Sequence, residues 1–144
     1  MKRPLCPVLI LSLFSFATLR GVEITATAPG SPLRKTILDD LRAAEPTASM
    51  QKAKKQNIVF DNVLLRVAGD WIWFSVVPRT EDSTWHSEPL MGLLRFSSGH
   101  WRVVAYVGDG PSGPGKPGKG YEAWRAGLLK KNPGCPPELV PKKG

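Results

Sequence analysis

Cysteine and histidine are scarce in this chain of 144 residues, which has two of each. A closed zinc site takes four Cys or His ligands, so one could be completed here only with carboxylates. The longest apolar stretch, residues 5 to 19, is shorter than the ~20 residues of a membrane-spanning helix. The G-x-S-x-G motif of the α/β-hydrolase nucleophile is absent. We therefore predict no metal site, no cofactor and no catalytic residue.

The N-terminus has the pattern of a secretory signal peptide. Lys2 and Arg3 precede the apolar stretch, as in the basic head of such signals. We assign residues 1–28 to the signal, with cleavage between residues 21 and 28. The alternative is an uncleaved N-terminal anchor. Removal of 1–28 leaves no membrane span, 17 basic and 11 acidic residues, and Cys135 as the single cysteine, which excludes an intramolecular disulfide.

An amphipathic helix is predicted at the start of the mature chain. Ser31-Pro32 reads as an N-cap followed by proline at the first helical position. Apolar residues then recur every three or four positions up to Pro46. The apolar positions of this stripe are Leu33, Ile37, Leu38, Leu41 and Ala44. Residues 45 to 56, with a cluster of lysines, read as a solvated loop.

From residue 57 the apolar period changes from 3.6 to 2, which indicates strands. We predict one long strand with a bulge, or two short ones, over residues 58–67. Further strands are expected at residues 71–77, 90–96 and 101–107. The expected fold class is α+β: an N-terminal helix packed on a four- to five-stranded antiparallel meander, with a short C-terminal helix.

Two Gly-x turns suggest how the strands pair. A loop at Gly69-Asp70 places Arg66 opposite Trp73 and gives one continuous apolar face. For the second hairpin we expect a loop at Gly99-His100. The alternative loop, one residue earlier, would set two arginines opposite each other, at positions 95 and 102, and like charges destabilise a sheet.

The rest of the chain divides by composition. Residues 29–107 form the predicted core of the domain. Residues 108–120 are rich in Gly, Pro and Lys and are expected to be a flexible segment. Helical spacing follows over residues 121–131, and residues 132–144 read as a Pro-rich tail.

Four motifs together resemble a group of small exported bacterial proteins of uncharacterised function. They are RKxILDxLR at 34–42, LRVxGDW at 65–71, LLR at 93–95 and GxWRVV at 99–104. The resemblance covers roughly residues 33 to 107, and more loosely the helix from residue 121. The order of helix and meander also looks like the cystatin-like and nuclear-transport-factor-2-like folds. This second likeness is architectural and carries no function.

Two ligand classes are excluded. Gly110-x4-Gly115-Lys116 matches the spacing of a phosphate-binding loop, but Pro117 stands where Ser or Thr would hold magnesium. Nucleotide binding is therefore not expected. The basic residues are spread along the chain without an aromatic-basic motif, which argues against nucleic acid. The positive charge fits a polyanionic component of the cell envelope better.

Two further functions stay open as alternatives to non-catalytic binding. One is a small hydrolase built on His86 and the carboxylates of its loop, at residues 81, 82 and 88. The other is an assembly partner that is linked through Cys135 in the tail.

The binding hypothesis rests on the sheet face that the first helix leaves free. If this face is open, arginine and aromatic side chains gather on it, and these types dominate binding hot spots. If it is closed, the C-terminal helix packs Trp124 on it. Trp85 is a separate candidate, because its polar loop leaves an indole without an evident structural use. The candidate binding residues are Arg66, Trp73, Arg95, Tyr106 and Trp85. We expect an exported protein, periplasmic or extracellular, whose partner is an envelope protein or an envelope polyanion.

Overall fold

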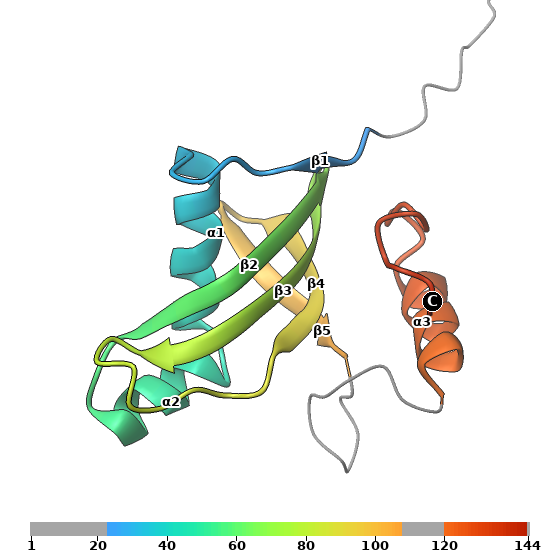
Figure 1. Ribbon diagram of the computed structural model, residues 1–144. Coiled ribbons are helices and arrows are strands. Elements are labelled where there is room, and N and C mark those ends of the chain that lie inside the picture. The colour runs from blue at the N-terminus through green and yellow to red at the C-terminus, as the bar shows by residue number, and fades with distance from the viewer. Residues whose placement is uncertain (1–22, 108–119, 144) are drawn as a thin grey trace, which may run out of the picture.

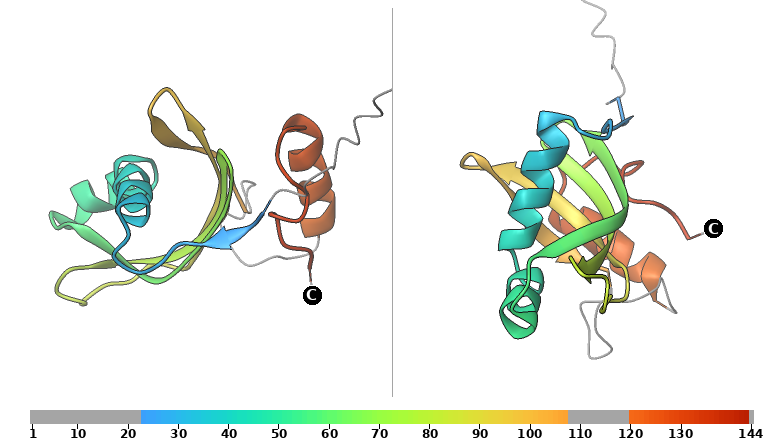
Figure 2. Two further views of the ribbon diagram at one scale, coloured as in Figure 1. Left: turned by 90° about the horizontal axis from the view of Figure 1, so that it is seen from above. Right: turned by 60° about the vertical axis from the view of Figure 1, so that its left-hand side comes forward.

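The computed structural model describes residues 23–107 and 120–143. It contains a five-stranded antiparallel sheet in the order β1-β2-β3-β4-β5, which confirms the predicted α+β class. The sheet is strongly curved, with α1 and α2 on its concave side and α3 on its convex side (Figures 1 and 2). The elements are β1 Thr25–Ala26, α1 Pro32–Ala43, α2 Thr47–Lys54, β2 Ile58–Ala68, β3 Trp71–Thr80, β4 Leu90–Ser97, β5 His100–Tyr106 and α3 Tyr121–Lys131.

Helix α1 begins at Pro32, and the Ser31 hydroxyl accepts a hydrogen bond from the Arg34 N–H at 3.1 Å. Ile37 and Leu41 are buried against the sheet. Leu33, which the periodicity places on the same stripe, is 42% exposed. The buried stripe is therefore shorter than the sequence indicates.

The prediction of a loop over residues 45 to 56 is wrong, because α2 occupies residues 47–54. The segment contains Ala, Met, Gln and Lys, which all have high helix propensity. Thr47 is almost fully buried, so this helix is held by contact with the rest of the domain despite its polar surface. Of the lysines that we placed in a loop, Lys52 and Lys54 lie on α2 and Lys55 is its C-cap.

The β2–β3 hairpin has the predicted register. Arg66 pairs with Trp73 around the Gly69-Asp70 turn, where Gly69 has a φ of +59°. β2 is one strand with an irregularity between Asp61 and Leu64, which settles the choice between one long strand and two short ones. Asn62 adopts a φ of +48° there.

The β4–β5 hairpin has the register that we rejected. Its turn is Ser98-Gly99, both residues with positive φ, and Arg95 lies opposite Arg102. Positive φ at both central residues is the signature of the tight hairpin turn that suits twisted strands. The repulsion is relieved because the Arg95 guanidinium stacks over Trp71, 5.0 Å from its ring centroid. The next pair, Phe96 and Trp101, gains a ring contact at 5.1 Å.

The two sheet faces carry separate cores. On the concave side, α1 covers a cluster centred on Ile72, Phe74 and Leu94. Phe96, at the hairpin end of β4, is 41% exposed. On the convex side, α3 and the C-terminal segment cover Trp73 and Leu93. The Pro-rich tail is thus part of the fold, with Leu139 fully buried.

Residues 1–22 and 108–119 lie outside the described residues, so the signal peptide and the Gly/Pro/Lys segment stay predictions. The last residues of the assigned signal are described, and Thr25–Ala26 pairs with Val67 and Arg66 of β2. Within the described ranges, no helix has the length and hydropathy needed to cross a membrane.

Candidate functional site

Of the two alternatives for the sheet face that α1 leaves free, the structure has the closed one. Trp73 is 4% exposed, and its ring lies 6.3 Å from that of Trp124 in an edge-on contact. Arg66 lies beside Trp73 as predicted, but its Nη2 donates a hydrogen bond to the Glu138 carbonyl at 3.0 Å. The two residues therefore hold the C-terminal segment, and the open-face hypothesis is wrong.

Arg95 and Tyr106 do not share a face. Arg95 stacks on Trp71 on the convex side, whereas Tyr106 contacts Phe74 on the concave side at 5.8 Å. The β4–β5 pairing shifts between Leu93 and Leu94, where β5 has one extra residue. This extra residue turns the side chain of Tyr106 to the sheet face opposite to that of Arg95. Since a bulge leaves no clear mark in a single sequence, the spacing of these residues was misleading.

Trp85 has a structural partner. The Lys54 ammonium lies 4.7 Å from the centroid of its ring, a cation–π contact that joins α2 to the β3–β4 loop. The indole is half-buried. The sequence did not suggest this pair because Lys54 was assigned to a loop.

The His86 loop has no catalytic arrangement among the described residues. Asp82 accepts hydrogen bonds from the hydroxyl of Thr80, from the N–H and hydroxyl of Thr84, and from Gln56. These bonds, that of Thr80 foremost, lower the pKa of Asp82 well below its ordinary value. His86 is exposed, and within residues 23–107 and 120–143 its ring makes no hydrogen bond. The hydrolase alternative therefore finds no geometric support.

Cys135 is not an exposed thiol. It is 3% exposed in the convex core, and burial raises its pKa to about 11. A thiol that is buried and protonated is neither accessible nor nucleophilic. The assembly alternative, which needs a tail cysteine at the surface, is therefore contradicted in this conformation.

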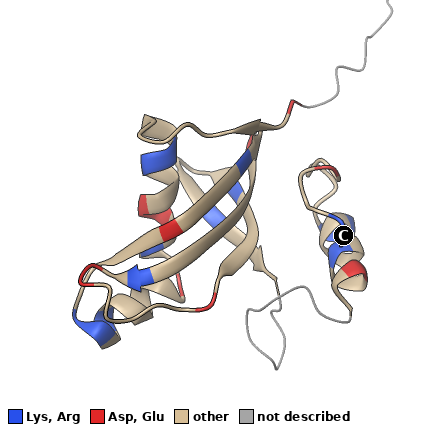
Figure 3. Ribbon diagram, in the orientation of Figure 1, with Lys and Arg blue, Asp and Glu red and all other residues tan. Residues whose placement is uncertain are grey.

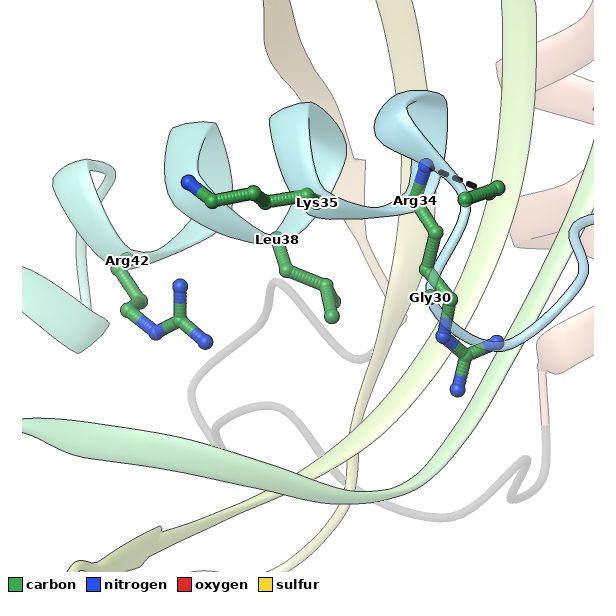
Figure 4. Close-up of a pocket in the computed structure, with 6 residues that line it drawn as sticks. Gly30, Arg34, Lys35, Leu38 and Arg42 are labelled. Atoms are coloured by element: carbon green, nitrogen blue, oxygen red, sulfur yellow. Dashed lines mark hydrogen bonds between the residues drawn. The ribbon is translucent and has the colours of Figure 1, made fainter.

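A basic groove runs along α1. It is a hollow of about 220 Å³ that is lined by Gly30, Ser31, Arg34, Lys35, Leu38 and Arg42. Arg34, Leu38 and Arg42 leave the same side of the helix and point toward β2, as Figure 4 shows. Their spacing of four residues places them one above another on the helix. We call this hollow the α1 groove.

Arg42 is fixed at one end of the α1 groove. Its Nε donates a hydrogen bond to the Ile58 carbonyl at 2.9 Å, and its guanidinium lies 5.5 Å from the Phe60 ring centroid. Nη1 forms an ion pair with Asp39 at 2.6 Å. A guanidinium held in this way keeps part of its donor set directed into the groove at little entropic cost.

Charge in the α1 groove is predominantly positive. Lys35 also pairs with Asp39, at 2.6 Å, and the hydrogen bond from Lys35 is the main reason that the pKa of Asp39 is lowered. Within residues 23–107 and 120–143, the Arg34 guanidinium has no hydrogen-bond or ion-pair partner. Of the three cations, Lys35 and Arg42 thus share the Asp39 carboxylate, and Arg34 pairs with no described carboxylate. Figure 3 shows that Lys and Arg also occur on the strands, on α2 and on α3.

A second cavity, of about 380 Å³, lies between the C-terminal half of α1 and β5. On its wall, Asp40 bridges two groups: Oδ1 lies 3.0 Å from His100 Nδ1, and Oδ2 accepts the Trp101 N–H at 2.8 Å. We call it the α1–β5 cavity. Sequence reasoning missed the Asp40–His100 pair, because the expected register put His100 within the turn itself.

In the described part of the chain, no group of three or more His, Cys, Asp or Glu residues lies close enough together to hold a metal ion.

No family model matches this chain, and no solved structure matches it. It is 30% identical over 87 residues to a leucine–tRNA ligase of Rhodopseudomonas palustris strain BisB5, and 31% identical over 87 residues to that of strain TIE-1. These alignments cover 57% of this chain and 10% of each enzyme. The chain thus spans about a tenth of the length of the curated relatives it matches.

Proposed function

We propose that this chain is an exported, non-catalytic binding protein whose α1 groove holds an anionic polymer of the cell envelope. The observation that carries the proposal is the cationic lining of the α1 groove by Arg34, Lys35 and Arg42, of which the last two pair with Asp39. The partial similarity to leucine–tRNA ligases does not enter the proposal, because it covers a tenth of those enzymes.

The spacing of the cations favours a polymer over a single ion. Arg34 and Arg42 are eight residues apart on α1, which separates their backbones by about 12 Å. Arg42 is held by Asp39 and by the Ile58 carbonyl, so a chain whose successive charged units reach both ends of the groove fits this spacing better than one small anion does. The excess of 17 basic over 11 acidic residues that remains after removal of residues 1–28 also favours association with polyanions.

Export is proposed from the N-terminal pattern together with the resemblance to small exported bacterial proteins. Because Ile24 packs against the convex core and β1 pairs with β2, we place the cleavage site before residue 24. A later cut would remove the edge strand. The helix-on-sheet arrangement is proposed to be of the cystatin-like or nuclear-transport-factor-2-like type.

The test compares two double variants of equal charge change. Arg34→Gln with Lys35→Gln removes two cations from the α1 groove, and Lys130→Gln with Lys131→Gln removes two from the end of α3. Binding to long-chain polyphosphate and to a carboxylated polysaccharide, polygalacturonate, is measured by calorimetry at two salt concentrations. The groove variant should bind at least about tenfold more weakly than the wild type and show a lower salt dependence. Equal losses in both variants would mean that net charge alone drives binding.

A further inference from the structure

The outer edge of β5 carries main-chain groups that no strand of the described sheet uses. β5 is the last strand of the sheet, and Ser97 and His100 close its two-residue turn. In an antiparallel ladder, hydrogen-bonded pairs alternate with pairs whose N–H and C=O point outward. The Trp101 N–H points outward, since it donates to Asp40. By the same alternation the N–H and C=O of Val103 point outward as well.

Val103 lines the α1–β5 cavity, so its outward groups face an open volume. Within the described ranges, no residue outside β4 forms a hydrogen bond with the N–H or C=O of Val103. The cavity is bounded on its far side by α1, where Ala43 and Ala44 leave room beside the strand. A strand edge facing a helix across a gap is the geometry in which extended peptides add to a sheet.

Charge on the helix side of the α1–β5 cavity is negative. Asp40 is engaged by His100 and by the Trp101 N–H, whereas the Glu45 carboxylate accepts only the Ser49 N–H, at 3.3 Å, and forms no ion pair with a described residue. On the strand side, His100 and Arg102 also line the cavity, and among the described residues no ion pair joins Arg102 to Glu45. An unneutralised carboxylate therefore faces the occupant of the cavity.

We propose that the α1–β5 cavity binds an extended peptide segment of a partner protein, which adds to β5 as a short strand. The Val103 N–H and C=O supply the main-chain hydrogen bonds. Side chains of a strand alternate, so two residues of the peptide spaced by two face α1. One is small and apolar, beside Ala44, and the other is Lys or Arg, which pairs with Glu45. This site is separate from the α1 groove and does not rest on the proposed function.

The probe is a blocked pentapeptide, acetyl-Thr-Ala-Thr-Lys-Thr-amide, titrated into the full chain. Binding is followed by the amide NMR signals of Ala44 and Glu45. We expect a saturable shift at millimolar peptide. Val103→Pro removes the outward N–H at an edge position where proline is tolerated, and should weaken binding by about tenfold or more. Glu45→Gln should weaken it similarly, and so should a peptide with Glu in place of Lys.

Two controls keep the result interpretable. A peptide that is N-methylated at its central threonine removes a main-chain donor without altering the protein, so it tests the edge even if Val103→Pro fails to fold. Arg34→Gln should leave peptide binding unchanged, which separates this site from the α1 groove. The proposal is overturned if no saturable shift occurs, or if the methylated peptide binds as well as the parent. It is also overturned if the chain without peptide is a dimer and Val103→Pro dissociates that dimer. In that case the edge of β5 pairs with a second copy of the chain and not with a partner peptide.

Discussion

The convex core makes a quantitative prediction about Trp73. This side chain is 4% exposed, and it links the sheet to α3 through its edge-on contact with Trp124. Truncation of a buried Trp to Ala costs about 3–5 kcal/mol, from lost apolar burial and from the cavity left behind. A single domain of this size has about 5–15 kcal/mol in total. Trp73→Ala should therefore remove a large fraction of the free energy of unfolding.

The assay is urea unfolding followed by far-ultraviolet circular dichroism, which avoids the overlapping fluorescence of the five tryptophans. Trp85→Ala is the matched control, since it removes an indole that contributes a cation–π contact of about 0.5–1 kcal/mol at an exposed site. A double-mutant cycle of Trp73→Ala and Trp124→Ala should give a coupling of about 0.5–1.5 kcal/mol, typical of aromatic pairs.

A loss below about 1 kcal/mol for Trp73→Ala would refute the reasoning, because no buried Trp that joins two layers can be removed so cheaply. Zero coupling with Trp124 would show that α3 does not pack on the sheet as described.

Two further predictions concern titratable groups. Burial raises the pKa of Cys135 to about 11, so iodoacetamide at pH 8 should leave Cys135 unmodified in the folded chain. In denaturant the same reagent should alkylate Cys135, and mass spectrometry distinguishes the two results. Rapid labelling of the folded chain would contradict the burial of this thiol. The pKa of Asp82 is lowered below its ordinary value of 3.8, so the stability that its hydrogen bonds supply is present above that pH and is lost as the pH falls below it. Asp82→Asn should therefore flatten the acid side of the stability–pH profile, and an unchanged profile would mean that the carboxylate contributes nothing.

Local signals in the sequence were sufficient for part of this fold. The Ser31-Pro32 start of α1 depends on capping chemistry within one turn of helix. The register of the β2–β3 hairpin follows from the Gly69-Asp70 turn, and it continues without a shift from the Ala68–Trp71 pair to the Leu64–Ser75 pair. These features involve residues that are close in the chain, so the chain order alone specifies them.

The β4–β5 register, by contrast, depended on a residue in another strand. In the observed pairing, the arginines at positions 95 and 102 are opposite each other. Their like charges destabilise the sheet only if the two guanidinium groups stay close together. Arg95 instead stacks on Trp71, which β3 brings next to it. The α1–β5 cavity, with its Asp40–His100 pair, exists only in this register.

The role of the C-terminal segment was likewise decided by tertiary structure. Its prolines indicate a chain without regular structure, and that is correct locally. Its position comes from hydrogen bonds made by distant side chains: Arg125 donates to the Val140 carbonyl and Arg66 to the Glu138 carbonyl. These bonds place Leu139 in the convex core, over the sheet face that the sequence left as either open or closed. The composition shows which residues are apolar enough to be buried. Which surface covers them depends on the tertiary packing of the whole chain.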